Sequence, residues 1–425
     1  MKNICFVLIL LLSLQSYFGH AQEHPLARLW KVNDSEIPRL LELERNLTEL
    51  DKILSQILEQ DDYITNFAGS YINLMNESIV VMTLNLSKFN DLISLPEINP
   101  HRNFFHPGNA TISTAQLRKN FEQITQIALN IRPINIFFYI NIEINNIILF
   151  FEYKNNTINE KFINETEPFH PHIIYAEEPP YSLAQQTIKS PRDVRKISVI
   201  IPGGEGIFNH GPESYGCSVG FWARDAINTK NTYIITTGHG IDSRLGLNEF
   251  YPWPWENNAP PPESRKIIIG TPVVFSVNTF DYALIKVKRK NVIPSFEVRN
   301  SDFAQYPILF INDGLHASGH GIHLCKSGHT THFTCGYIKG FNGIFGDEEG
   351  FTRNLIITDM LAKDGDSGGS VISFDAPNNL RSVSLAGIHA AQSINIAAGQ
   401  SLETIISAVN SSWNIKIVPV LRPRG

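Results

Sequence analysis

The stretch Lys363-Asp-Gly-Asp-Ser-Gly-Gly-Ser370 places one hydroxyl, that of Ser367, between glycines on both sides. Glycine lets the backbone turn sharply and approach a ligand closely, so the pattern predicts a tight turn that exposes Ser367. The N–H groups of Gly365 and Ser367 would then donate to an oxyanion that develops on a substrate. Because a serine hydroxyl is a poor nucleophile until a base removes its proton, the pattern requires a histidine and an acid elsewhere.

Two upstream stretches supply these partners. His239 follows the apolar run Tyr233-Ile-Ile-Thr-Thr-Gly, and Asp281 precedes a second apolar run, Tyr282-Ala-Leu-Ile-Lys-Val. The chain order of histidine, aspartate and serine is one of the known orders of a Ser-His-Asp triad. We expect His239 to act as the general base, and Asp281 to hold its tautomer and stabilise the imidazolium.

Four segments resemble sequence boxes of the chymotrypsin-like serine proteases, most closely those of the secreted streptogrisin and α-lytic branch. They are Cys217-Ser-Val-Gly-Phe221, Thr236-Thr-Gly-His239, Asp281-Tyr-Ala283 and Gly365-Asp-Ser-Gly-Gly369. The resemblance implies that residues 197–425 are all-β, with two six-stranded Greek-key barrels and the site between them. It also implies a secreted endopeptidase that is made as a precursor and uses no cofactor and no metal. Short apolar runs separated by Gly, Asn and Pro agree with an all-β part.

Two other interpretations of the serine motif stay open. Gly365-x-Ser367-x-Gly369 also matches the nucleophile elbow of α/β-hydrolases, which place their acid and histidine after the serine. The short segment after Ser367 holds one histidine, His389, and too little chain for the remaining βα units, so we disfavour that fold. The other alternative is a secreted glycoprotein with an inert protease-like fold that binds proteins without cleaving them.

The resemblance also implies a specificity pocket. Leu361 stands six residues before the serine, where trypsin-like members hold an aspartate, so we expect no anchor for Lys or Arg side chains. Ala386-Gly-Ile-His-Ala-Ala391 resembles the Gly-x-His stretch of glutamyl endopeptidases and viral cysteine proteases, whose histidine donates to Glu or Gln. We expect His389, Ala390 and Gln392 to contact the substrate; a structural histidine or a small apolar pocket is the equal alternative. Ala390 also replaces a family serine that binds the triad aspartate.

Residues 1–21 are typical of a secretory signal. Lys2 precedes the apolar run 4–14, and Gly19-His-Ala21 is a small-x-small cleavage site. The run is too short for a membrane anchor, and no later apolar stretch reaches about 18 residues. The net charge of −6 gives no indication of a nucleic acid or an anionic membrane as partner. We therefore expect a secreted protein that acts on protein or peptide substrates.

Three cysteines remain after the signal: Cys217, Cys325 and Cys335. The stretch from Cys325 to Cys335 matches a family loop that closes as a hairpin disulfide, the expected state in a secreted chain. Cys217 lacks its family partner because Gly240 stands after the histidine, so we expect a free, buried thiol. Several histidines near the hairpin have ligand types that suit zinc, but their spacing matches no regular zinc module. They are His316, His320, His323, His329 and His332.

Residues 22–196 form a different, α/β region without a catalytic constellation. Periodicity and turn signals predict its elements: helices over 34–60 and 113–131, strands over 67–73 and 78–84, and a hairpin across Asn145-Asn146. The resemblance implies that this region is a pro-region that helps the protease to fold and then inhibits it. A binding domain that stays attached is the alternative.

A proline-rich linker is expected over 167–196, ending in a basic spot open to processing at Arg192, Arg195 and Lys196. The protease part would begin around 197–201. The resemblance leaves two partners open for Asp366, a new amino terminus or an internal arginine. Seven glycosylation sequons indicate a solvent-exposed, glycosylated surface on the N-terminal region. They start at Asn33, Asn46, Asn76, Asn85, Asn109, Asn155 and Asn164.

Overall fold

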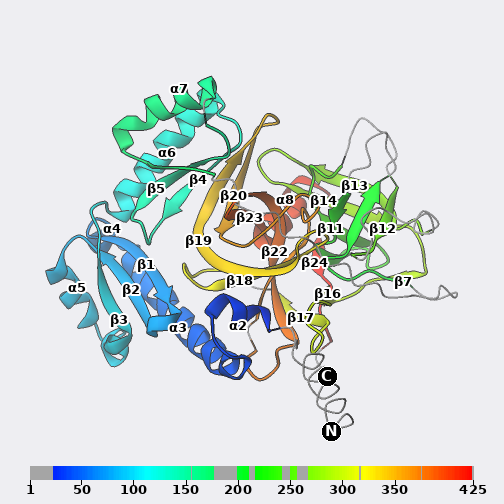
Figure 1. Ribbon diagram of the computed structural model, residues 1–425, viewed down its shortest axis with the longest axis horizontal. Coiled ribbons are helices and arrows are strands. Elements are labelled where there is room, and N and C mark those ends of the chain that lie inside the picture. The colour runs from blue at the N-terminus through cyan, green and yellow to red at the C-terminus, as the bar shows by residue number, and fades with distance from the viewer. Residues whose placement is uncertain are drawn as a thin grey trace, which may run out of the picture.

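The computed structural model describes most of the chain outside its two ends and several internal stretches. The described residues are 23–154, 156–176, 199–209, 216–241, 249–255, 267–314, 317–374 and 376–423. The expected signal peptide, the basic residues Arg192, Arg195 and Lys196, and His316 lie outside them. Strands dominate the second half of the chain, and helices and strands share the first half (Figure 1).

The first large sheet has eight strands in the order β24-β10-β11-β14-β13-β12-β8-β9. At its centre, β11 (Thr232–Thr236) pairs antiparallel with β14 (Tyr282–Val287), and Thr236 lies opposite Ala283. The end of β11 and the start of β14 therefore lie at the same end of this strand pair, where His239 follows β11 and Asp281 precedes β14. The other strands are β8 (Gly206–Asn209), β9 (Gly216–Ser218), β10 (Phe221–Asp225), β12 (Phe250–Trp253), β13 (Gly270–Ser276) and β24 (Ile417–Pro419).

The second large sheet has eleven strands, nine of them on the path β16-β17-β22-β21-β18-β19-β4-β5-β6. Ser367 immediately precedes β21 (Ser370–Phe374), which pairs with β22 (Ser382–Ser393), the strand that carries His389. Further strands are β16 (Glu297–Arg299), β17 (Ile308–Gly314), β18 (His323–Gly328), β19 (His332–Gly346), β20 (Phe351–Thr358) and β23 (Ile396–Ser401). The part after the expected linker is mostly β, with one α-helix, α8 (Leu402–Ser412), near its end. The arrangement as two six-stranded barrels stays a prediction.

The N-terminal region is built as helices and strands where the sequence predicts them. The predicted helices are α3 (Ile37–Leu58) and α6 (Thr114–Ile131), and the predicted hairpin is β4 (Ile136–Asn141) with β5 (Asn146–Phe151). The further elements are α2 (Pro25–Trp30), α4 (Asp61–Ile64), β1 (Phe67–Asn73), β2 (Ser78–Thr83), α5 (Leu86–Ile93), β3 (Phe105–Asn109) and α7 (Thr157–Thr166). The expected linker begins with a 3-10 helix over Glu167–Phe169, followed by a strand, β6 (His172–Tyr175), which pairs parallel with β5.

Strand pairing joins the N-terminal region to the second sheet. β4 pairs antiparallel with β19, so that Phe137 lies opposite Phe345. Figure 1 shows the long, curved β19 running between the two parts of the molecule. A second link is the bond from the Ile72 N–H to the His320 carbonyl, at 2.9 Å. The two parts therefore share one continuous hydrogen-bonded sheet.

Burial of α2 adds an apolar contact to this boundary. Leu26 and Ala27 are wholly buried, and Trp30 lies edge-on to the His323 ring at 5.7 Å. These residues belong to the same apolar cluster as Val371 and Ile388, which flank the candidate site. Because burial of apolar area is the main favourable term in association, this cluster holds the N-terminal region on the second sheet.

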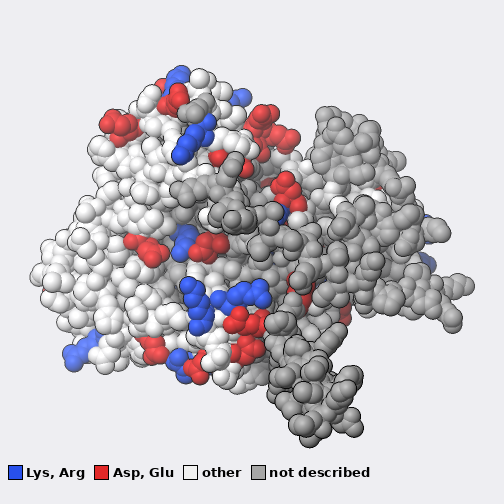
Figure 2. All heavy atoms as spheres, viewed as in Figure 1, with Lys and Arg blue, Asp and Glu red and all other residues white. Residues whose placement is uncertain are grey.

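The surface shows charges of both signs. On the face in Figure 2, Lys and Arg are interspersed with Asp and Glu.

Each sequon asparagine that the structure describes is exposed: Asn33, Asn46, Asn76, Asn85, Asn109 and Asn164. Glycosylation stays a prediction, and Asn155 lies outside the described residues. Among the helices that the structure describes, none is both long enough and apolar enough to span a bilayer.

Candidate active site

The serine motif forms the tight turn that its glycines predict. Gly365 has φ of +95° and Gly368 has φ of +87°, conformations that side chains other than glycine's rarely adopt. A Cβ on Gly368 would lie 2.1 Å from the Thr236 hydroxyl, at the end of β11. The turn therefore touches the strand that leads to His239. Only 8% of Ser367 is exposed, so the hydroxyl is less open to solvent than the motif predicted.

Ser218, at the end of β9, ties the first sheet to this turn. Its N–H donates to the Ser367 carbonyl at 2.7 Å, and its hydroxyl donates to the Gly365 carbonyl at 2.7 Å. Its own carbonyl accepts from the Thr236 hydroxyl at 2.8 Å. Ser218 therefore fixes the nucleophile's turn from the sheet that carries His239, and it lies within one of the four recognised boxes.

Asp366 is buried beside Ser367 and is paired with Lys326 of β18. The ammonium lies 3.0 Å from the carboxylate, and neither side chain is exposed. Thr331 donates to Asp366 through its hydroxyl at 2.6 Å and its N–H at 2.9 Å, and the Thr330 and Lys363 N–H groups donate as well. Burial raises the pKa of Asp366, but the Lys326 charge and the Thr331 bonds outweigh it and lower the pKa from 3.8 to about 2.

Lys326 is therefore the charged partner of Asp366. The resemblance had left two other partners open for this aspartate, a new amino terminus or an internal arginine. Its Nζ also donates to the Thr331 hydroxyl at 2.6 Å. No sequence signal distinguished Lys326, because it stands next to Cys325 in an ordinary strand and its burial depends on the pairing of β18 with β21. The Asp366 carboxylate already has a full set of donors in the uncut chain.

His239 and Asp281 meet at one end of the central strands β11 and β14 of the first sheet. The His239 Nδ1 lies 2.6 Å from the Asp281 Oδ2, while the other carboxylate oxygen accepts the N–H groups of Gly238 and His239 at 2.6 and 3.1 Å. The carboxylate therefore orients the ring and leaves Nε2 as the nitrogen open to a substrate or nucleophile. The His239 side chain is 38% exposed, whereas that of Asp281 is 4% exposed.

Gln400 of β23 holds the backbone of Asp281. The Gln400 Oε1 accepts the Asp281 N–H at 3.1 Å, and its Nε2 donates to the Arg353 carbonyl at 3.2 Å. Ala390, which stands where a serine donor was expected, offers the carboxylate no side-chain bond. The side chain of the wholly buried Gln400 supports the Asp281 backbone, a role that no sequence pattern indicated.

The charge state of His239 is set by its carboxylate partner. Desolvation lowers the pKa of His239, but the Asp281 charge and hydrogen bond outweigh it, and the charges of Asp347 and Glu349 add to them. The pKa of His239 is therefore raised above its ordinary 6.5. A histidine with a raised pKa is a stronger base, provided that the solution pH keeps it neutral.

Two features of the turn concern the reacting groups directly. Between the described residues Ser367 and His239 there is no hydrogen bond, a common state in structures without substrate. The N–H groups of Gly365 and Ser367 donate to no other described residue, so both are available to an acceptor. This pair is the one that the sequence predicts for an oxyanion.

His389 lies against the Ser367 turn from β22. Its carbonyl accepts the Gly368 N–H at 2.7 Å, and its N–H donates to the Gly369 carbonyl at 2.8 Å. The wholly buried ring places Nε2 2.6 Å from the Gln392 Oε1, and the Gln392 Nε2 donates to Asp364 at 2.9 Å. Burial and the Lys326 charge lower the pKa of His389 to about 4, against the opposing effects of Asp366 and Gln392.

The other predicted pocket residues differ in their burial. Ala390 is buried next to His389, and its exposed fraction is 4%. Leu361, expected at the pocket floor, is 51% exposed. Its carbonyl accepts the Thr334 hydroxyl at 2.8 Å. A half-exposed side chain does not suit the floor of a closed pocket, so the structure lends that role no support.

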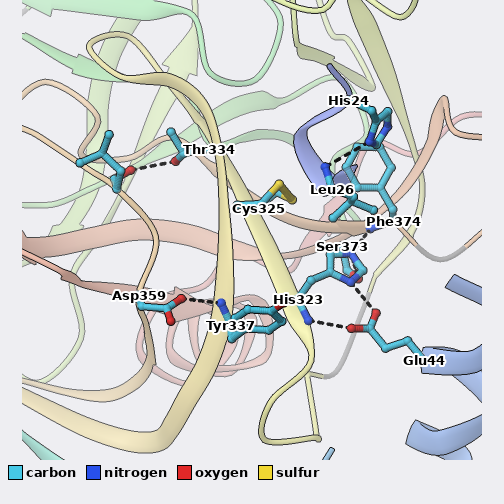
Figure 3. The surroundings of a disulfide bond; sticks show 12 residues. His24, Leu26, Glu44, His323, Cys325, Thr334, Tyr337, Asp359, Ser373 and Phe374 are labelled. Carbon is cyan, nitrogen blue, oxygen red and sulfur yellow. Dashed lines mark hydrogen bonds and ion pairs between the residues drawn. A yellow bond between two sulfur atoms is a disulfide. The ribbon is translucent and has the colours of Figure 1, made fainter. Parts of the chain in front are cut away.

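The cysteine pattern is as expected. Cys325 and Cys335 form a disulfide between β18 and β19, and Cys217 is a free, buried thiol. Figure 3 shows the disulfide's surroundings, with the His323 ring turned toward Glu44 of α3. The His323 N–H donates to the same carboxylate at 2.9 Å, and the ring Nε2 accepts the Phe374 N–H at 3.0 Å. This histidine is thus part of the boundary with the N-terminal region.

The remaining histidines near the hairpin lie apart from one another. His320 lies edge-on to Phe341, His329 lies beside Trp253, and His332 stacks on Trp255. Within the described ranges, no group of three or more His, Cys, Asp or Glu residues is arranged to hold a metal ion. Their placement therefore matches the ring packing of ordinary structural histidines.

The N-terminal region reaches the same site. Ile174 and Ala176, at the end of β6, pack against the apolar cluster that contains Ala390 and Ala391. Glu152, which follows β5, lies close enough to Asp364 to be repelled. Desolvation, followed by that repulsion, raises the pKa of Glu152. The last described part of the N-terminal region thus shares an apolar cluster with Ala390 and Ala391, next to His389.

No protein-family model and no curated protein sequence matches the chain. Similar solved structures include Protease A of Thermobifida fusca, with 19% identity, a TM-score of 0.40, and coverage of 52% of this chain and 100% of that chain. A chymotrypsin of Cellulomonas bogoriensis has 23% identity, a TM-score of 0.39, and coverage of 52% and 100%. A glutamic acid specific serine protease, described as using a novel histidine triad in substrate binding, has 21% identity, a TM-score of 0.38, and coverage of 50% and 98%. These neighbours are serine proteases.

Proposed function

We propose that this chain is a secreted serine endopeptidase, made as a precursor, that uses His239, Asp281 and Ser367. The observation that carries the proposal is the three-bond grip of the Asp281 carboxylate on Gly238 and His239. This grip lies at the end of β11, the strand that the Ser367 turn touches through Gly368. A base oriented by a carboxylate beside a serine on a glycine turn is the arrangement that nucleophilic acyl transfer requires.

In the proposed reaction, the His239 Nε2 takes the proton from the Ser367 hydroxyl as the oxygen attacks the substrate carbonyl carbon. The carbonyl oxygen becomes an oxyanion, which accepts the N–H groups of Gly365 and Ser367. The imidazolium, stabilised by Asp281, then gives its proton to the leaving amine, and the peptide bond breaks. Water repeats the sequence on the acyl-enzyme and releases the carboxylic acid.

The N-terminal region is proposed as the inhibitory partner in the precursor. Two observations support this role. Asp366 is fully bonded by Lys326 and the backbone, so the serine turn does not wait for a new amino terminus. Ile174 and Ala176 pack against an apolar cluster that includes Ala390 and Ala391, next to His389. Latency then comes from coverage of the site, and not from a misformed turn.

The direct test is labelling by a fluorophosphonate, which reacts only with an activated serine. The full chain is expressed in a secreting cell, and the secreted product is purified and exposed to the probe. Wild-type protein is expected to be labelled, and the Ser367→Ala variant is the unlabelled control. A folded wild-type protein that has lost its N-terminal region and still stays unlabelled would end this proposal.

Processing is tested separately by amino-terminal sequencing of the secreted product. We expect a start near residues 197–201, after the basic spot that ends at Lys196. A product that begins only near Gln22 would show that the N-terminal region stays attached. Labelling is therefore read on the processed product, because an attached N-terminal region would keep the probe from the serine.

A second candidate function is an inert, protease-like glycoprotein that binds proteins. It is favoured by the lack of a hydrogen bond between the two described residues Ser367 and His239. The same labelling distinguishes the two functions. A biological effect that survives Ser367→Ala unchanged would support the binding function.

A further inference from the structure

His389 and Asp364 present one donor and one acceptor on the two sides of the Ser367 turn. We infer that they form a slot for a primary carboxamide, that Gln392 fills this slot at rest, and that a substrate glutamine side chain before the cleaved bond displaces it. The inference rests on the proposed protease function. It narrows the expected preference from Glu or Gln to Gln alone, because the slot suits the amide and not the acid.

The bonds inside the slot define what it recognises. The His389 Nε2 lies 2.6 Å from the Gln392 Oε1, and the Gln392 Nε2 donates to the Asp364 Oδ1 at 2.9 Å. A carboxamide has one oxygen that accepts and one nitrogen that donates, so its two ends match the imidazole N–H and the carboxylate. Gln392 thus shows, within the chain itself, how an amide is held there.

Both walls of the slot are fixed to the serine turn. His389 is bonded through its backbone to Gly368 and Gly369, at 2.7 and 2.8 Å. Asp364 stands three residues before Ser367, and its carbonyl accepts the Thr330 hydroxyl at 2.6 Å. A side chain held between these walls therefore belongs to the substrate residue next to the bond that Ser367 attacks.

Charge decides between glutamine and glutamate. A glutamate carboxylate offers two acceptors, one of which would face the Asp364 carboxylate with no proton between them. His389 is buried and neutral near pH 7, and the Lys326 charge is already paired with Asp366. Like charges placed together in this way repel each other, so we expect an acidic side chain to be disfavoured. Glu152 adds a second negative charge at this place in the uncut chain.

The first test compares cleavage of matched peptides that differ only at the residue before the cleaved bond. We expect kcat/KM for the glutamine peptide to exceed that for the glutamate peptide by on the order of 10²-fold, and to exceed that for leucine as well. A preference for glutamate or leucine, or equal rates for glutamine and glutamate, would overturn the slot.

Variants then assign the preference to the two walls. In Asp364→Asn the repelling carboxylate becomes an amide that can also donate, so the ratio of glutamine to glutamate cleavage should fall about tenfold or more. Asp313→Asn makes the same change on an exposed part of β17 and should leave the ratio at its wild-type value. An unchanged ratio in Asp364→Asn would contradict the inference.

Gln392→Ala tests the resting occupant. Removing the internal competitor should lower KM for the glutamine peptide and leave KM for the leucine peptide nearly unchanged. Equal effects on both peptides would show that Gln392 does not compete for the slot, and would overturn that part of the inference.

A binding measurement separates this inference from the proposed function. The Ser367→Ala chain cannot turn over, so calorimetric titration with the glutamine and glutamate peptides reports the slot alone. Tighter binding of the glutamine peptide supports the slot even if the wild type is never labelled by a fluorophosphonate. Equal binding overturns the slot even if labelling succeeds.

Discussion

His239 and His389 both lie beside the Ser367 turn, yet their surroundings give them opposite properties. His239 lies in the turn after a strand of the first sheet. Its side chain is 38% exposed and is bonded to the Asp281 carboxylate, which raises the pKa of His239. His389 sits within a strand of the second sheet, is wholly buried and has only an amide, that of Gln392, as hydrogen-bond partner for its ring. Its pKa falls to about 4.

The difference teaches that the partner, and not the residue type, decides what a histidine can do. A carboxylate partner stabilises the imidazolium, so the ring can hold a proton during a reaction. Burial and a nearby buried cation keep the His389 ring neutral, because the Gln392 amide carries no charge that could offset them, so the ring remains a fixed donor. The site thus contains one histidine, His239, that is suited to transferring protons, and another, His389, that is suited to donating a hydrogen bond to a substrate side chain.

The largest difference between the two histidines is expected when each is replaced by alanine in turn. His239→Ala should lower kcat by about 10⁶-fold and abolish labelling, because no base remains for the serine. His389→Ala should keep fluorophosphonate labelling and lose the distinction between glutamine and other peptides. Equal loss of labelling in the two folded variants would show that both rings serve the same step.

Asp281→Asn tests whether the charge of the carboxylate is needed for catalysis. The amide preserves the shape but removes the charge that stabilises the imidazolium and fixes its tautomer, so kcat should fall by about 10⁴-fold. Gln392→Glu is the matched change at the other histidine, where a carboxylate replaces an amide. It should raise the pKa of His389, measured by NMR titration of the ring. An unaltered His389 pKa would contradict the partner argument.

Lys326→Met addresses the buried cation that lowers the pKa of His389. It leaves the Asp366 carboxylate buried without its counter-charge, which should cost about 3 to 5 kcal/mol in the free energy of unfolding. Lys339→Met, on the partly exposed ion pairs of β19, should cost about 0 to 1 kcal/mol. Urea unfolding measures both, and Lys326→Met combined with Asp366→Asn should recover much of the loss.

The smallest expected effect is on the pH dependence. The neutral form of His239 is the active base, and its pKa is raised, so kcat/KM should fall as pH decreases through a value above 6.5. His389→Gln should leave this limb in place, because His389 is already neutral there. A limb centred below 6.5, or one that moves in His389→Gln, would assign the titration to another group.

Local patterns predicted the parts of the site that local sequence encodes. The glycines around Ser367, the histidine after an apolar strand and the aspartate before another each report their own turn or strand end. The helices α3 and α6, the β4–β5 hairpin and the Cys325–Cys335 disulfide are likewise signals of neighbouring residues. These features were predicted because each needs only a few positions of sequence.

Groups that act through long-range pairing were missed. Lys326 and Gln400 look like ordinary strand residues, and their contacts with Asp366 and Asp281 arise only when distant strands align. Gln392 was predicted to contact substrate, but its own bond to His389 follows from the bend of one strand in the folded sheet. The β4–β19 pairing joins segments on either side of the expected linker, a contact that periodicity within one segment cannot reveal.

That pairing has a consequence for solubility. While β4 is present, residues 344–346 of β19 have their backbone groups covered, and the Phe345 ring lies 4.6 Å from that of Phe137. A molecule that loses its N-terminal region would present this stretch as a bare strand edge with an uncovered aromatic ring. Such an edge is a template for a second copy. We therefore expect the N-terminal region to limit self-association through this edge, and a molecule that has lost it to associate as its concentration rises.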